Sequence, residues 1–124
     1  MLGFAPVFVR EFPENGRAGA WRELRDLQLN PNTALSGKVK ELAGLAVASQ
    51  IPCRYCVIAH TEFAKLNGAT DTEIAEAIGM AALTRNLSTM LNGLEVDETQ
   101  FRRDIDKLVK NAGAAKKPAT TASR

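Results

Sequence analysis

Both cysteines and the only histidine of this 124-residue chain lie within one short stretch, IPCRYCVIAH. Cys53 and Cys56 are three residues apart and His60 follows four residues later, so on a helix their side chains share one face. A thiol is a poor nucleophile until it loses its proton, and the imidazole one turn away could accept that proton directly or through a water. Two cysteines one turn apart can also close a disulfide after one is oxidised. The stretch therefore contains a nucleophile, a base and a resolving thiol.

Three other interpretations of this stretch must be weighed. Buried cysteines are often inert small hydrophobic residues, and a single histidine is usually structural. A metal is the second alternative, because Cys53, Cys56 and His60 offer three ligands, but structural zinc normally takes a fourth and the chain has no further Cys or His. A thioredoxin-type motif is disfavoured because no βαβ pattern surrounds the cysteines.

Composition and charge exclude several classes of function. The net charge of +2 leaves no basic stripe for a nucleic acid, and charged runs such as RELR and FRRD read as solvated helix faces. No apolar run approaches the roughly 20 residues of a membrane span. The first residues lack the basic lead-in of a secretory signal, so we expect a cytoplasmic protein, in which a cysteine pair is more often catalytic or metal-binding than a structural staple.

Helices must position these residues, since strand signals are weak and the proline within FAPVFVREF demotes that stretch to an extended arm. We expect an all-α single domain at residues 17–112, an N-terminal arm at 1–16 and a disordered tail at 113–124. The clearest helix starts are Thr70 with Glu73 and Asp97 with Gln100. The expected helices end near Asn30, Ile51, Gly68, Asn92 and Gly113.

The helix after Glu73 is apolar on all sides for two to three turns, from Ile74 to Leu83. A small subunit has too few neighbours of its own to cover such a helix. We expect a subunit interface there, the alternative being a central helix in a compact bundle.

With these residues in hand, the stretch from Ala34 to Leu94 resembles the carboxymuconolactone decarboxylase and alkylhydroperoxidase D superfamily. The shared features are a lysine-rich helix start, the glutamate of KEL, Cys-x-x-Cys-x-x-x-His, then Gly-Ala-Thr and a capped helix. The family's active site pairs a glutamate twelve residues before the first cysteine with both cysteines and the histidine. Those positions fall on Glu41, Cys53, Cys56 and His60. The resemblance implies an alkylhydroperoxidase-D-like helical bundle assembled as a homo-trimer or homo-hexamer, without a cofactor or metal.

The resemblance also implies a mechanism. Glu41 and His60 draw the proton from Cys56, the thiolate attacks a hydroperoxide, and Cys53 condenses with the resulting sulfenic acid to a disulfide. An external dithiol, from a lipoylated or thioredoxin-like protein, then restores the pair. Helix-end electrostatics favour Cys53 as the attacking thiol and proximity to the base favours Cys56. We choose Cys56, because a general base must be within reach before its pKa matters.

Glu41 also makes physical sense without the resemblance. It lies in an otherwise apolar helix, and Gly44, Leu45 and Ala48 on its side are small enough, or apolar enough, for another helix to approach. A buried carboxylate is costly without a partner, and His60 is the natural one. The alternative is a solvated glutamate in the run KVKE.

The chain departs from the family at Tyr55, which replaces a second histidine of the founding enzyme, so a relay role for that histidine does not carry over. Arg54 could favour the thiolate or steer an anionic substrate, or be merely exposed. Two alternatives to a peroxidase stay open. One is a redox switch or partner-binding oligomer that uses the disulfide, and the other is a carboxymuconolactone decarboxylase-like enzyme or related isomerase, which needs no cysteines.

Overall fold

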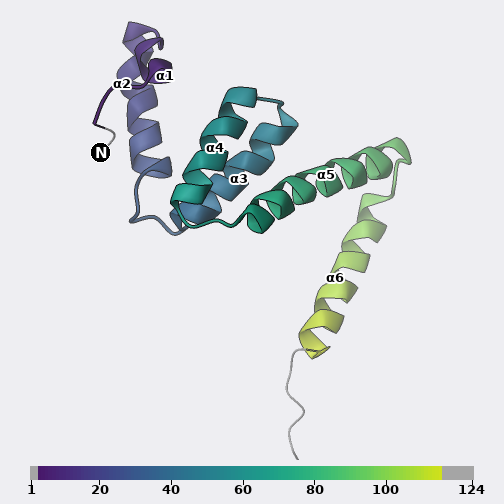
Figure 1. Ribbon diagram of the computed structural model, residues 1–124. Helices are drawn as coiled ribbons and strands as arrows, with labels where there is room; N and C mark the ends of the chain where they lie inside the picture. Colours follow the sequence, from purple (N-terminus) through teal and green to yellow (C-terminus); the bar gives the residue numbers. More distant parts are fainter. Residues whose placement is uncertain (1–2, 116–124) are drawn as a thin grey trace, which may run out of the picture. The chain divides into compact units, whose positions relative to one another are not determined.

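The computed structural model describes residues 3–115, and every regular element within them is a helix, as the sequence predicts (Figure 1). The chain divides into two compact units, Met1–Arg85 and Asn86–Arg124, and each is described by itself. The elements are α1 (Val7–Arg10), α2 (Glu14–Glu23), the π-helical turn η1 (Leu24–Gln28), α3 (Gly37–Gln50), α4 (Arg54–Leu66), α5 (Asp71–Gly93) and α6 (Glu98–Ala115).

The prediction of an extended arm for the first residues is wrong, because Val7–Arg10 form the helix α1. Pro6 stands at the N-cap of this helix, and its carbonyl accepts the backbone N–H groups of Val9 and Arg10 at 3.0 and 3.1 Å. Pro13 caps α2 in the same way, so that helix begins at Glu14, before Arg17. Proline is suited to a helix start, because it lacks only an N–H that would be unpaired there. The two prolines therefore begin helices and do not merely interrupt a strand.

Helix α2 continues into η1, where the backbone hydrogen bonds span five residues and not the four of an α-helix. The N–H of Leu29 bonds the carbonyl of Leu24 at 3.0 Å, five residues back. Single π turns inside α-helices are uncommon and are often found at functional sites. The sequence predicts a continuous helix here, and the π turn is a finding of the structure.

Helices α3 and α4 form a helical hairpin, packed side by side (Figure 1). Ser36 caps α3 by accepting the N–H of Val39 at 3.3 Å. A short turn over residues 51–53 leads into α4, which ends at Leu66. Asn67 is its C-cap, and Gly68 follows with a φ of +82°. The N–H groups of Gly68 and Ala69 bond the carbonyls of Lys65 and Ala64, both at 2.9 Å, the pattern of a Schellman motif.

The core of this unit is small and lies mainly on the hairpin, with one residue from α5. Its buried apolar residues are Leu45, Ala48, Ala64 and Ala81. Small residues of the hairpin, Gly44 and Ala48 of α3 and Ala64 of α4, are buried or lie against the other helix, and bulkier side chains there would hold the two helices apart. The close approach places groups from one helix directly against groups of the other.

Helix α5 begins with the predicted capping box. Thr70 Oγ1 accepts the N–H of Glu73 at 3.1 Å, and the Glu73 carboxylate accepts the N–H of Thr70 at 2.8 Å. Glu73 also pairs with Lys38 of α3 at 2.8 Å. The ammonium of Lys38 and the Thr70 backbone N–H hold the pKa of Glu73 below its usual range.

The second unit contains the end of α5 and α6. Asp97 accepts the N–H of Gln100 at 2.6 Å, as the sequence predicts for the start of α6. The helix continues to Ala115, beyond the expected end at Gly113, and the rest of the expected disordered tail lies outside the described residues. No helix within residues 3–115 is both long and apolar enough to cross a membrane.

Candidate functional site

The hairpin brings Glu41 of α3 and His60 of α4 into direct contact. Glu41 Oε2 lies 2.7 Å from His60 Nδ1. The glutamate is only 2% exposed, and the imidazole is largely covered. The expectation that Glu41 turns inward to His60 is confirmed, and the solvated alternative is wrong. A carboxylate so deeply buried needs partners, and the imidazole is one of them.

Gln28 is the second partner, and sequence reasoning missed it. Its side-chain amide donates to Glu41 Oε1 at 3.0 Å and to Oε2 at 3.1 Å. It stands at the end of η1, thirteen residues before the carboxylate. Nothing in its neighbourhood along the chain marks it, since it is a single polar residue between Leu27 and Leu29. Only the packing of η1 on α3 gives it a role.

The contact with Glu41 decides which ring nitrogen of His60 carries a hydrogen. An ionised carboxylate can only accept hydrogen bonds, so Nδ1 of His60 must carry the hydrogen in that contact. In the neutral imidazole Nε2 is then without a proton and presents its lone pair. The arrangement therefore leaves Nε2 of His60 free to accept a proton.

Gly44 makes the contact between the helices possible. A Cβ added to this residue would lie 2.5 Å from Cε1 of His60 and 2.7 Å from each ring nitrogen. No real side chain tolerates such distances, so only glycine leaves room for the imidazole against α3. Glycine in a helix interior costs about 1 kcal/mol relative to alanine, and here it admits the ring.

Cys53 and Cys56 form a disulfide, with their Cα atoms 5.2 Å apart. Cys53 is the N-cap of α4, one residue before the helix, so it stands slightly outside the opening turn in which the sequence placed it. Its sulfur accepts the backbone N–H of Cys56 at 3.1 Å. After reduction, such a donor stabilises a thiolate on Cys53.

Cys56 lies four residues before His60 on α4, and helical side chains lean towards the N-terminus, so the ring leans in the direction of this sulfur. Within residues 3–115 no hydrogen bond joins either sulfur to the ring in the disulfide form. Arg54 and Tyr55 point away from the core: both are exposed, with the guanidinium 4.9 Å from the centre of the tyrosine ring.

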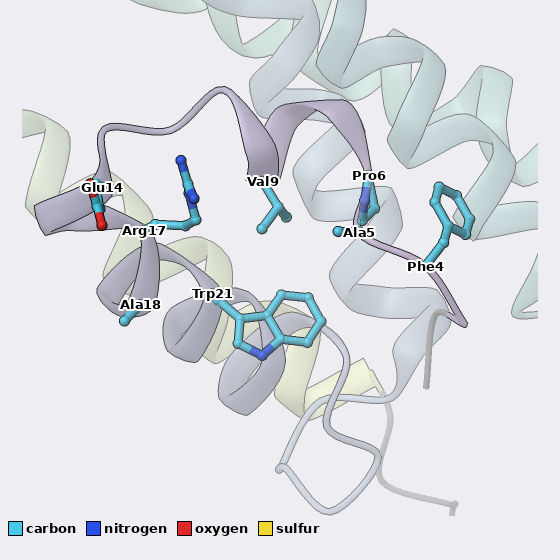
Figure 2. A pocket seen from close by; sticks show the side chains of 8 residues that line it. All are labelled: Phe4, Ala5, Pro6, Val9, Glu14, Arg17, Ala18 and Trp21. Atoms are coloured by element: carbon cyan, nitrogen blue, oxygen red, sulfur yellow. The ribbon is translucent and has the colours of Figure 1, made fainter.

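No group of three or more His, Cys, Asp or Glu side chains placed to hold a metal ion occurs in the described part of the chain. An open hollow of about 470 Å³ lies on α1 and α2, where Val9 and Trp21 are among its lining residues (Figure 2). None of Glu41, Cys53, Cys56 and His60 lines it. The hollow is thus separate from the cysteine–histidine cluster.

Comparison with known proteins identifies the family of the chain. The model of the carboxymuconolactone decarboxylase family matches residues 18–99, a range that includes Glu41, both cysteines and His60. The chain belongs to this family. It is 37% identical over 76 residues to "Uncharacterized protein 4 in cox locus" of Paracoccus denitrificans, covering 58% of this chain and 68% of that protein. No solved structure matches the chain significantly.

Proposed function

We propose that the protein is a thiol-dependent hydroperoxide reductase, a disulfide oxidoreductase of the alkylhydroperoxidase D type. One observation carries the proposal. A cysteine pair able to form a disulfide stands one turn from an imidazole whose Nδ1 is held by a buried carboxylate. A nucleophile, a base and a group that orients the base are the parts that thiol catalysis needs.

In the first step the Cys56 thiol of the reduced protein gives its proton to Nε2 of His60, directly or through a water. Glu41 holds the ring and stabilises the imidazolium that forms. The Cys56 thiolate attacks one oxygen of the hydroperoxide, the O–O bond breaks, and the alcohol leaves with the proton held by His60. Cys56 is now a sulfenic acid, oxidised by two electrons.

In the second step the Cys53 sulfur attacks the sulfenic sulfur of Cys56. The S–S bond forms, the S–O bond breaks, and water leaves. The product is the disulfide present in the structure. An external dithiol, on a lipoylated or thioredoxin-like protein, returns two electrons and two protons and is itself oxidised to a disulfide.

We assign the attack to Cys56 because it is one turn from the base. The backbone N–H that the Cys53 sulfur accepts is an argument for the opposite order. Replacing each cysteine by serine and trapping sulfenic acid decides between them. Sulfenic acid in Cys53→Ser supports the assignment, and sulfenic acid only in Cys56→Ser reverses it.

The function is tested by consumption of an organic hydroperoxide with dithiothreitol as reductant, in wild type, Cys56→Ser and His60→Ala. We expect turnover in the wild type and its loss in both variants, because each removes a group that the first step requires. Reversible formation of the disulfide without turnover would favour the redox switch. Activity that survives Cys56→Ser would favour the decarboxylase-like alternative, which does not need the thiol.

A homo-trimer or homo-hexamer is part of the proposal. Large apolar side chains of α5 are exposed in the single chain, among them Met80 and Leu83 in the first unit and Leu87 and Met90 in the second. Exposed apolar surface of this extent is typical of subunit contacts. Analytical ultracentrifugation tests it, and a monomer at micromolar concentration would contradict it.

A further inference from the structure

We propose that Gln28 is a positioning residue that sets the tautomer of His60 through the carboxylate of Glu41. The proposal rests on the proposed function only in its consequence for catalysis. The positioning itself follows from hydrogen bonds of the first unit and can be measured without any activity.

Gln28 is the sole partner of one of the two carboxylate oxygens. Oε1 of Glu41 accepts from the Gln28 amide at 3.0 Å and, within the described residues, from nothing else. Oε2 accepts from both Gln28 and His60. Because the carboxylate is 2% exposed, water cannot easily replace the amide. Without Gln28, a buried charged oxygen is left without a donor, which is among the costliest arrangements in a protein interior.

The carboxyl group can escape this cost by taking up a proton or by turning towards solvent. In either case Glu41 no longer accepts the Nδ1 hydrogen of His60 in the same way. A neutral histidine released from that bond can place its proton on Nε2 instead. The nitrogen that should accept the proton of Cys56 is then already occupied. Gln28 acts on the base through Glu41, to which both of its amide hydrogen bonds go.

The segment that bears Gln28 is itself fastened to the helix that bears Glu41. Lys40, the residue before Glu41, donates from Nζ to the carbonyl oxygens of Leu27 and Asn30, both at 2.7 Å. These carbonyls lie at and beyond the end of η1, where helical carbonyls lack internal partners and an ammonium is favourable. Lys40 thereby holds the Gln28 backbone against α3.

The π turn sets the direction in which the Gln28 side chain points. Widening the helix by one residue rotates all later side chains by about 100° relative to a continuous α-helix. Gln28 is the last residue of that turn and faces α3. The π turn and Lys40 together place the Gln28 amide against the buried carboxylate of Glu41.

The experiment uses the single histidine as its own probe. In the 15N-labelled, disulfide-bonded protein the two ring nitrogens of His60 report the tautomer directly, with no other imidazole signal. The variants are Gln28→Leu, which removes the donor at similar size, and Lys40→Met, which loosens the segment but leaves the amide. Leu27→Ala is the matched control, because this side chain is in the same turn and is 63% exposed.

We expect the Nδ1–H form to dominate in wild type and Leu27→Ala. Losing a hydrogen bond to a charged group changes an equilibrium constant by about tenfold or more. The ratio of the Nδ1–H to the Nε2–H tautomer should therefore fall about tenfold in Gln28→Leu. It should fall in the same direction, by less, in Lys40→Met. A wild-type ratio in folded Gln28→Leu overturns the proposal, as does an equal change in Leu27→Ala.

The activity assay separates the two proposals. If the wild type reduces hydroperoxide, Gln28→Leu should lower kcat and alter its pH profile while leaving KM unchanged. If the wild type shows no turnover but the tautomer ratio shifts as expected, the positioning role holds and the proposed function fails. If the wild type turns over and Gln28→Leu changes neither ratio nor rate, the positioning role fails and the proposed function holds.

Discussion

Gly44→Ala is the most direct test of the contact between the imidazole and α3. The new Cβ would lie 2.5 Å from His60 Cε1 and 2.7 Å from Nδ1 and Nε2. Ordinary contacts between such atoms are about 3.5 Å, so the ring must retreat by about 1 Å. Glu41 cannot follow it freely, because it is buried and held by Gln28. The 2.7 Å bond to the ring is therefore stretched or broken.

Stability and activity should respond differently to this change. Replacing glycine in a helix interior contributes about 1 kcal/mol in favour of the variant. Losing a hydrogen bond to a charged group costs about 1.5–3 kcal/mol, so the net loss in free energy of unfolding is about 1 kcal/mol. A misplacement of about 1 Å at a reacting group lowers the rate about a hundredfold. We therefore expect a folded protein with nearly abolished hydroperoxide turnover.

The measurements are urea denaturation, dithiol-dependent hydroperoxide consumption and the ring 15N spectrum of His60. Gly19→Ala in α2 is the matched control, since a Cβ there meets nothing within 4 Å. The control should be as stable as wild type or more so, with unchanged activity and spectrum. Wild-type turnover and an unchanged His60 spectrum in Gly44→Ala would refute the reasoning, because the ring would then not be confined by α3.

Two further predictions concern the carboxylates. Glu41→Gln keeps the shape of the side chain but removes the charge that stabilises an imidazolium on His60. General acid–base catalysis typically contributes about a hundredfold or more, so kcat should fall by that factor. An unchanged kcat in the folded variant would contradict this. Glu73 has a pKa held below its usual range by Lys38, so its pairing stabilises the fold above the ordinary glutamate pKa and is lost as pH falls through the lowered value. Acid titration of stability should therefore be steeper between about pH 5 and pH 3 in wild type than in Lys38→Met, and equal slopes would show that this ion pair contributes nothing.

Apolar side chains of α5 and α6 remain exposed in the single chain. Phe101 and Ile105 lie one helical turn apart on α6 and are both exposed in the single chain. The sequence marks them as one face of an amphipathic helix, and such a face is normally covered. A homo-oligomer would provide that cover.

Local signals in the sequence determined most of the helix boundaries. The capping pairs Thr70 with Glu73 and Asp97 with Gln100 lie within one turn, so their hydrogen bonds depend only on the backbone of that turn. The spacing of Cys56 and His60 likewise places them one turn apart on one helix, with Cys53 as its N-cap. The largest local error, the missed helix α1, arose from reading Pro6 as a strand breaker when it is also a favourable helix start.

Only the tertiary structure decided which groups meet across elements. The sequence supported the pairing of Glu41 with His60 because a carboxylate in an apolar helix needs a partner, and the chain has a single imidazole. It offered no comparable reason for Gln28, one polar residue among many, whose role depends on a π turn and on the packing of that turn against α3. Contacts within a turn follow from the residues that make them, whereas contacts between helices also depend on axial rotation and separation, which the whole core sets.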